Sequence, residues 1–294
     1  MAKRKFSKVV RGQHAVDGAG VRLRRVLGAG TIKDFDPFLM LDGFDSTNTN
    51  DYIRGFPWHP HRGIETVTYL LSGEIDHGDS LGNKGTINDL CCQWMTAGSG
   101  IIHQEMPIAS ERMLGCQLWV NLPAKDKMTE PAYRDIKPTD VAVVVEDNAV
   151  VRILSGNYRG QSGAVKNEYI KVQYLDVDLK PGSVWHYNVT PNDQTLFLYL
   201  IEGSLAADES LNQFEEKACA ILLSASSEKE DESDEIIVKS GNGGARFLLI
   251  AGKPLKEPVA WGGPIVMNTD EELDLAFREL NSHTFIKHER PQNF

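Results

Sequence analysis

The sequence predicts an all-β protein in which one antiparallel β-barrel fold is used twice and a short helix closes the chain. The first observation is the segment 64–71 (IETVTYLL), whose β-branched and aromatic residues are typical of a strand. The second is an internal echo, because the segment 69–73 (YLLSG) returns as 199–203 (YLIEG). The third is Thr269, which begins a capping-box pattern followed by apolar residues at helical spacing.

The length of 294 residues is enough for two ordinary domains. We expect an N-terminal barrel at residues 1–135, and a C-terminal barrel together with the closing helix at residues 136–294. The segment 123–138 is interpreted as a linker, because it combines three prolines with alternating charges.

Alternating or β-branched runs predict the strands of the N-terminal half. They lie at residues 21–27, 64–71 and 113–122, and the run 93–96 leads into the glycine-rich segment that begins at residue 98. The polar segment 46–55 is interpreted as an exposed loop directly before the first histidine pair. In the last strand, Gln117 and Trp119 share a face that could line a cavity, although an aromatic residue there more often belongs to a core.

The C-terminal half repeats this pattern of strands. They are predicted at residues 142–145, 150–154, 169–177 and around the echo at 199–203. The acidic segment 226–235 is too polar to bury and is interpreted as a solvated hairpin loop. The helix is predicted from Thr269 onward, with its apolar face at Leu273, Ala276, Phe277 and Leu280.

Two short histidine motifs indicate a metal site. His59 and His61 share one face of a predicted strand, and His103 and Glu105 share one face of another. Imidazoles with one carboxylate suit a borderline divalent ion such as iron, nickel, copper or zinc, and suit calcium or magnesium poorly. Glu65 has the same parity as His61, so strand geometry alone leaves open which glutamate is the fourth ligand.

These motifs resemble a known family. The pattern His-X-His-X3-Glu at 59–65 and the pattern Gly-X-Gly-X2-His at 98–103 resemble the two cupin motifs. The strings FPWHPHRGIETVTYLLSG, QWMTAGSGIIHQEMP and ARFLLIAGKPLKEPV resemble the pirin family specifically, and the resemblance runs from about Val9 to Arg278. It implies two jelly-roll (cupin) barrels packed as a bicupin, with one Fe²⁺ per chain in the N-terminal barrel only.

Carried onto this sequence, the resemblance implies His59, His61, His103 and Glu105 as metal ligands. General cupins take their carboxylate from the first motif, which here is Glu65. We take Glu105 as the ligand and Glu65 as a residue that lines the site or orients a ligand. His77 follows the Gly73 turn and is assigned to a hairpin end, away from the ligands.

The C-terminal barrel is expected to hold no metal. Between residues 163 and 252 its single histidine is His186, and no second imidazole or carboxylate lies two residues away. One weak ligand does not hold a metal at useful affinity, so this barrel is expected to be structural or to offer a surface to a partner.

Composition narrows the possible partners. The net charge of −10 argues against direct binding to nucleic acid. Residues 1–25 carry +7, which leaves −17 on the remainder, so we expect the basic segment to pair with acidic groups of the same protein.

The sequence contains neither an 18-residue apolar run nor a secretory signal. We therefore expect a cytoplasmic protein, present in the nucleus as well in a eukaryote, and we expect it to be a monomer. The four cysteines are interpreted as reduced thiols.

The leading function is an iron-dependent dioxygenase. Some pirin-like proteins are quercetin 2,3-dioxygenases, so the resemblance implies a flavonol-like substrate that is opened with O₂ and releases carbon monoxide. A metal lowers the pKa of a bound hydroxyl, and Glu105 or Glu65 is the candidate catalytic residue that accepts the proton.

Two other functions remain open at this stage. Other pirins are co-regulators of a transcription factor or bind a metabolic enzyme, which implies a protein partner and a switch on the oxidation state of iron. The cupins also permit a zinc isomerase or a structural metal, and purified iron proteins readily acquire other divalent metals.

Overall fold

The computed structural model describes residues 2–166, 169–189, 193–224 and 234–288. The described chain divides into two compact units, each assembled from separate stretches of sequence. Unit 1 comprises Met1–Gly12, Thr31–Pro37 and Thr139–Pro254, and unit 2 comprises Gln13–Gly30, Phe38–Pro138 and Leu255–Phe294. The main stretches meet between Pro138 and Thr139, and a domain boundary after residue 135 stays a prediction.

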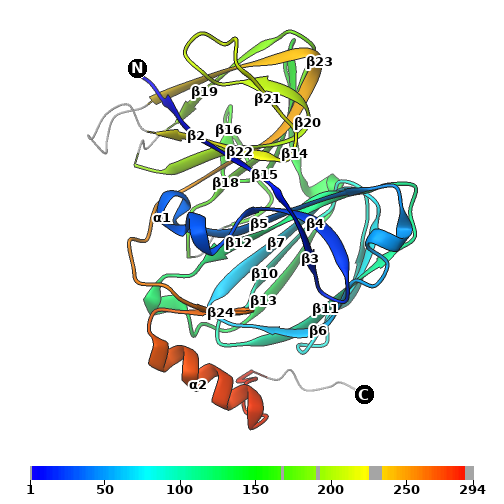
Figure 1. Ribbon diagram of the computed structural model, residues 1–294, viewed down its shortest axis with the longest axis vertical. Helices are drawn as coiled ribbons and strands as arrows, with labels where there is room; N and C mark the ends of the chain where they lie inside the picture. The colour runs from blue at the N-terminus through cyan, green and yellow to red at the C-terminus, as the bar shows by residue number, and fades with distance from the viewer. Residues whose placement is uncertain (1, 167–168, 190–192, 225–233, 289–294) are drawn as a thin grey trace. The chain divides into compact units, whose positions relative to one another are not determined.

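Unit 2 contains a larger and a smaller antiparallel sheet (Figure 1). In spatial order the larger sheet contains β13 (Ala132–Ile136), β10 (Cys92–Thr96), β7 (Ile64–Ser72), β12 (Met113–Asn121), β5 (Phe38–Ser46), β4 (Val21–Leu27) and β3 (Gln13–Asp17). The smaller sheet contains β6 (Phe56–His61), β11 (Ile101–Ile108), β8 (Glu74–Asp79) and β9 (Lys84–Ile87).

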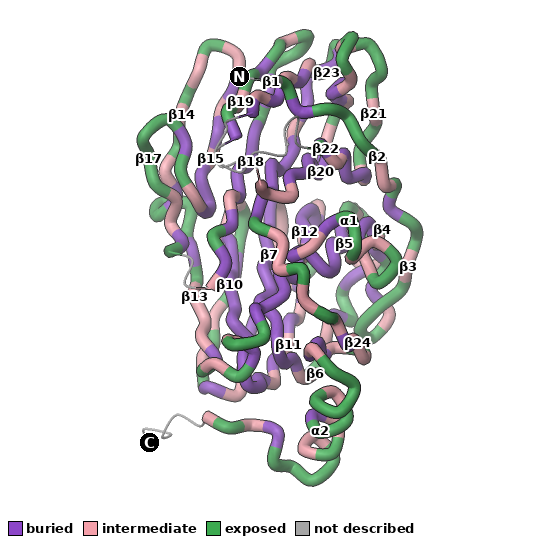
Figure 2. The backbone as a smooth tube through the Cα atoms, turned by 90° about the vertical axis from the view of Figure 1, so that its left-hand side faces the viewer, coloured by how far each residue is buried: buried purple, intermediate pink, exposed green. Residues whose placement is uncertain are grey.

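The central strands of the larger sheet are apolar and buried. In β7 the residues from Ile64 to Leu71 are all buried, and so is every residue of β10 (Figure 2). A strand that is buried along its whole length reads as a continuous apolar or β-branched run, which is how residues 64–71 read in the sequence. The three histidines of the two motifs lie on β6 and β11 of the smaller sheet.

The C-terminal stretch of unit 2 forms a hairpin and a helix. The hairpin pairs β24 (Ala260–Gly262) with β25 (Ile265–Met267), and helix α2 (Asp270–Asn281) packs against both strands. Thr269 caps the helix, since its side chain accepts a hydrogen bond from Glu272 N and the Glu272 side chain bonds back to the backbone of Thr269. The predicted capping box is therefore confirmed.

Unit 1 is also built mainly on antiparallel strands, and the short β1 pairs parallel with β23. Its main sheet runs β14 (Ala142–Val145), β15 (Ala149–Ser155), β18 (Gln173–Leu179), β23 (Asp234–Gly252), β20 (Thr195–Ala206), β22 (Cys219–Ser224) and β2 (Lys5–Arg11). Additional strands are β1 (Ala2–Lys3) and β19 (Val184–Val189) on β23, β21 (Phe214–Glu216) on β20, and the hairpin β16 (Asn157–Tyr158) with β17 (Gln161–Ser162). Val177, Leu198, Phe247 and other fully buried side chains form its core.

Short helices connect several strands. They are α1 (Ile32–Phe35) and the 3-10 helices η1 (Ala29–Thr31), η2 (Thr49–Asp51), η3 (Ala124–Asp126) and η4 (Pro138–Asp140). All helices among the described residues are too short or too polar to cross a bilayer. The all-β class with a short C-terminal helix is thus confirmed.

The predicted linker at residues 123–138 is wrong. Residues 132–136 form β13, which pairs with β10 from Ala132↔Thr96 to Ile136↔Cys92. Lys127 in the same segment is buried, with 2% of its surface exposed. Prolines are tolerated beside edge strands, so their number in this segment did not indicate a flexible connection.

The basic N-terminal segment pairs within the protein, as expected. In unit 1, Lys8 Nζ lies 2.7 Å from Asp34 Oδ2, and Arg11 pairs with Glu215. In unit 2, Arg22 pairs with Asp51, and Arg25 pairs with both Asp17 and Asp42. Residues 226–233 of the predicted acidic loop lie outside the described residues, and Asp234 and Glu235 belong to β23.

Candidate metal centre

Strands β6 and β11 bring the two histidine motifs together. They pair antiparallel, with His59 opposite His103 and His61 opposite Ile101. Because alternate residues of a strand share a face, His59 and His61 both point toward the neighbouring His103. A register shift between His103 and Glu105 leaves both residues buried.

The histidines converge within coordination distance of one point. Their ligand atoms all lie within 4.8 Å of one another, and the Nε2 atoms of His59 and His61 are 3.1 Å apart. The ring centroid of His103 lies 4.3 Å from that of His59 and 5.0 Å from that of His61. The three histidines therefore form a group that can hold a metal ion.

Backbone carbonyls orient two of the rings. His59 Nδ1 is 2.8 Å from Pro57 O, and His61 Nδ1 is 3.0 Å from Pro264 O. A proton on Nδ1 satisfies each carbonyl and leaves the Nε2 lone pair directed toward the other histidines, as in most histidine metal ligands. Pro264 thus connects the C-terminal hairpin to the site.

His103 differs from the other two histidines, because no backbone carbonyl in the described part of the chain orients its ring. It has 0% exposure, and among the described residues neither of its ring nitrogens has a hydrogen-bond partner. Buried polar atoms in native proteins are nearly always paired, so coordination of a metal ion would account for a buried imidazole whose nitrogens lack protein partners and which lies next to two other imidazoles. The residues present therefore fit a bound metal.

Burial also sets the charge of the site. It lowers the pKa of His61 to about 3, with a further contribution from the nearby His59. Burial lowers the pKa of His103 well below its ordinary value, and the neighbouring histidines act in the same direction. Both rings are therefore neutral at physiological pH, which is the form that binds a metal.

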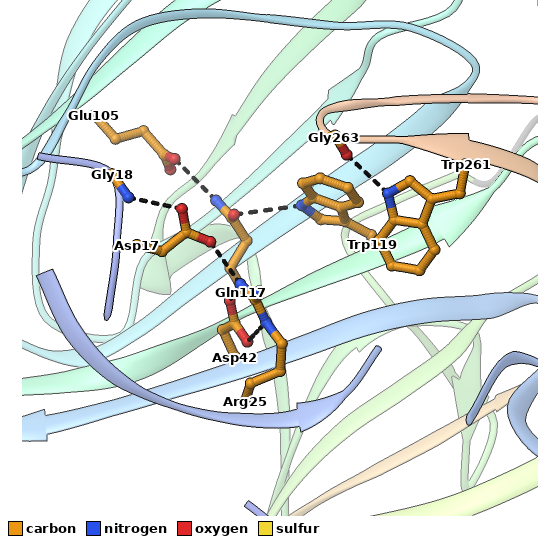
Figure 3. Close-up of polar contacts among 9 residues, drawn as sticks. All are labelled: Asp17, Gly18, Arg25, Asp42, Glu105, Gln117, Trp119, Trp261 and Gly263. Atoms are coloured by element: carbon orange, nitrogen blue, oxygen red, sulfur yellow. Dashed lines mark hydrogen bonds and ion pairs between the residues drawn. The ribbon is translucent and has the colours of Figure 1, made fainter. Parts of the chain in front are cut away.

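Glu105 follows His103 by two residues on β11, and its carboxylate is held by two neighbours. Thr68 Oγ1 donates to its Oε1 at 2.9 Å. Gln117 Nε2 donates to its Oε2 at 2.8 Å, as Figure 3 shows. Among the residues that the structure describes, the group of ligand atoms within 4.8 Å of one another comprises the three histidines. The assignment of Glu105 as the fourth ligand stays a prediction.

Glu65 belongs to the other sheet. The chain turns at Gly63, whose φ is +79° and where a Cβ would lie 1.9 Å from Val266 O. This turn separates β6 from β7. Glu65 and His61 therefore lie on different strands, and their spacing in the sequence does not place them on one face. Its carboxylate accepts a hydrogen bond from Thr96 Oγ1 at 2.7 Å.

His77 is the residue whose sequence assignment is wrong. It lies within β8 rather than at a hairpin end, and its partner in the sheet is Glu105. Its ring centroid is 5.6 Å from that of His103, and the ring stacks on Tyr133 at 4.4 Å. Asp79 Oδ2 lies 3.4 Å from His77 Nε2. The alternation His77-Gly-Asp79 was the signal in the sequence for a second polar pair near the site. Placing this pair beside His103 also requires the register of β8 on β11, which the sequence alone does not give.

A cavity of about 640 Å³ opens beside the histidines. His59, His61 and Gln117 line it together with the rings of Trp119 and Trp261. The two indole centroids lie 5.8 Å apart. This volume is in the range of small-molecule sites, and the cavity combines aromatic surface with a few polar groups as such sites do.

Arg62 and Lys127 hold the C-terminal stretch of unit 2 against the end of β6. Arg62 Nε donates to Ser99 O at 2.7 Å and Arg62 Nη2 donates to Phe285 O at 2.9 Å, while Nη1 lies 2.8 Å from Glu279 Oε2. Lys127 Nζ donates to Gly63 O, Asn121 Oδ1 and Val266 O at 2.7–3.0 Å. These buried cations fix the strand end that carries His61.

The chain matches known proteins along most of its length. The Pirin family profile matches residues 20–120, and the profile of the pirin C-terminal cupin domain matches residues 174–286. A Pseudomonas aeruginosa protein named as a candidate quercetin 2,3-dioxygenase is 44% identical over 274 residues, covering 91% of this chain and 93% of that protein. A pirin-like protein of Caulobacter vibrioides is 41% identical over 289 residues, covering 97% of this chain and all of that protein.

A solved structure gives the same picture of the fold. The crystal structure of a quercetin 2,3-dioxygenase from Acinetobacter baumannii matches with a TM-score of 0.85 and 30% identity, covering 97% of this chain and 99% of that one. Together with the family profiles, this match confirms the prediction of two cupin domains.

Proposed function

The chain belongs to the pirin family, and from that premise we propose that it is an iron-dependent dioxygenase of the quercetin 2,3-dioxygenase type. Its substrates are flavonol-like molecules and O₂. The observation that carries the proposal is the position of His59 and His61 on the wall of an aromatic-lined cavity of about 640 Å³. Relatives that share most of this chain are named for the same activity.

The proposed ligands of the iron are His59, His61, His103 and Glu105. When bound, iron supplies a Lewis acid that lowers the pKa of a substrate hydroxyl and a centre at which O₂ is activated. The neutral imidazoles donate nitrogen lone pairs, and the carbonyls of Pro57 and Pro264 hold two of the rings in the required orientation.

In this proposal Glu105 accepts the proton of the substrate hydroxyl. Thr68 and Gln117 hold its two carboxylate oxygens, and Gln117 itself lines the cavity. A carboxylate oxygen can accept about two hydrogen bonds, so the Glu105 oxygen that does not bind the iron has room for a proton donor from the substrate. Glu65 is the alternative acceptor, although its carboxylate is engaged by Thr96.

The test is turnover of quercetin by the iron-reconstituted protein. We expect oxygen consumption and carbon monoxide release in equal amounts, with substrate loss abolished under anaerobic conditions. H59A and H61A should lose iron and activity together. H186A is the matched control, because His186 is an exposed histidine of unit 1 that pairs with Glu235, and it should leave both unchanged.

The variants E105Q and E65Q distinguish which of the two glutamates accepts the proton. Turnover is compared per bound iron, because Glu105 is also a proposed ligand. Loss of a positioned general base costs about 10²–10⁴-fold in turnover, so turnover per bound iron in E105Q should fall by this factor while E65Q stays close to the unchanged protein. The reverse result would move the proton to Glu65. Iron binding without oxygen consumption by the unchanged protein would refute the dioxygenase and favour the co-regulator.

A further inference from the structure

The cavity beside the histidines has a polar wall that the proposed chemistry does not use. Asp17 on β3, Arg25 on β4 and Asp42 on β5 all line it. Arg25 Nε and Nη2 donate to the two carboxylate oxygens of Asp42 at 2.9 and 2.6 Å. Arg25 Nη2 also donates to Asp17 Oδ2 at 2.6 Å, so the three side chains form one cluster (Figure 3).

Asp17 and Arg25 keep hydrogen-bonding capacity for a ligand. Asp17 accepts one hydrogen bond from Gly18 N at 2.7 Å and one from Arg25, whereas a carboxylate can accept about four. Arg25 Nη1 makes no hydrogen bond to any part of the chain that the structure describes. The side chains of Asp17 and Arg25 are 48% and 36% exposed, while Asp42 is 6% exposed and serves as the anchor.

The cluster is negatively charged overall. Burial alone would raise the pKa of Asp17, but the hydrogen bonds from Arg25 and Gly18 outweigh it and the pKa is lowered. Burial raises the pKa of Asp42, and the two-pronged contact with Arg25 favours its ionised form. Two carboxylates and one guanidinium then leave a net charge of −1, which disfavours an anionic ligand on this wall.

The indoles lie on the other side of Gln117 from this cluster (Figure 3). Trp119 Nε1 donates to Gln117 Oε1 at 3.4 Å, and Trp261 Nε1 donates to Gly263 O at 2.7 Å. With their polar edges satisfied, both rings offer apolar faces that suit a planar aromatic molecule. The cavity therefore has three kinds of wall. Trp119 and Trp261 provide aromatic surface, His59 and His61 belong to the candidate metal site, and the cluster around Arg25 can bind hydroxyl groups.

We infer that Asp17 and Arg25 form a recognition subsite for hydroxyl groups of a neutral aromatic ligand, on the wall of the cavity that β3, β4 and β5 provide. This inference rests on the proposed function for the orientation of the ligand. A phenolic hydroxyl donates to Asp17 and accepts from Arg25 Nη1, so one group satisfies both residues. A carboxylate in its place could contact Arg25 only at the cost of repulsion from Asp17.

The experiment measures binding without turnover. Quenching of tryptophan fluorescence under anaerobic conditions gives the Kd of three ligands: quercetin, the same flavonol without the two hydroxyls of its pendant ring, and a flavonol with a carboxylate on that ring. For the unchanged protein, we expect quercetin to bind about tenfold more tightly than the flavonol without those hydroxyls, the effect of roughly 1.4 kcal/mol of hydrogen bonding.

D17A should remove this difference. The Kd of quercetin should rise about tenfold, the Kd of the dehydroxylated flavonol should stay the same, and the carboxylated flavonol should bind more tightly because Arg25 then faces a neutral neighbour. D45A is the matched control, because Asp45, like Asp17, is a partly exposed aspartate that pairs with an arginine (Arg112, at 2.8 Å), but it does not line the cavity. It should leave all three affinities unchanged.

Two outcomes would overturn the subsite. One is an equal loss of affinity for all three ligands in D17A, which indicates a change of cavity shape, and the other is an unchanged ratio. Neither outcome depends on turnover, so the subsite and the dioxygenase fail separately. Binding with the expected ratios but without oxygen consumption would keep the subsite and reject the proposed reaction.

Discussion

His103 shows how the candidate site costs stability at the level of single residues. Its ring is fully buried and, among the described residues, both nitrogens are unpaired. A buried polar atom left without a partner costs about 1–3 kcal/mol. The metal-free protein is therefore expected to be strained by a residue that a bound metal would satisfy.

Two leucine substitutions test this with opposite signs. In metal-free protein, H103L removes unpaired polar atoms and should raise the free energy of unfolding by about 1 kcal/mol or leave it unchanged. H61L should lower it by about 1–3 kcal/mol, because Pro264 O then loses its donor. Denaturant titration in the presence of a chelator measures both. A large destabilisation by H103L would contradict this account of the orphaned ring.

Lys127 gives a pH dependence of stability. Burial lowers its pKa from 10.5 to about 8, so between these values the unfolded chain binds a proton that the folded chain does not. The contribution of Lys127 to stability therefore rises as pH increases from 8 to 10.5, by at most about 1.4 kcal/mol per pH unit. The unfolding free energies of the unchanged protein and of K127M, measured over this range, should diverge with that sign. Parallel curves would refute it.

At the level of elements, the C-terminal stretch of unit 2 depends on one arginine. The Arg62 guanidinium contacts Ser99 O, Phe285 O and Glu279, and it lies 4.2 Å from the centroid of the Phe285 ring. The planar fork of arginine makes these contacts in several directions at once, which the single nitrogen of lysine does not.

R62K should therefore lower the free energy of unfolding by about 2–4 kcal/mol, although the charge is kept. Hydrogen exchange should become faster across α2 and around Phe285. T269A is the comparison, because it removes only the helix cap and should cost about 1 kcal/mol with faster exchange in the first turn alone. Equal behaviour of the two variants would argue against Arg62 as the anchor.

The elements also show which parts of the site a sequence can predict. The alternation around His59, His61, His103 and Glu105 depends only on strand geometry, and the structure brings the three histidines together as expected. Glu65 was less predictable because the chain turns at Gly63. His77 was missed because its proximity to His103 follows from the register of β8 on β11, which local sequence does not encode.

At the scale of the whole molecule, each unit draws on stretches that are far apart in the sequence. Pro264 and Trp261 contribute to a site whose first ligand is His59, some two hundred residues earlier. Local patterns predict strands such as residues 21–27 and 142–145, which the structure reproduces as β4 and β14. They do not predict such distant pairings, because these depend on packing between remote segments.

The hydrogen bond between His61 and Pro264 has a consequence for biosynthesis. A protein emerges from the ribosome with its N-terminal end first, so β6 and β11 are exposed well before the hairpin of β24 and β25 exists. Until that hairpin arrives, the His61 ring lacks the acceptor that fixes its tautomer and direction. A truncated translation product ending before residue 264 would consequently carry every histidine of the centre and still assemble it poorly.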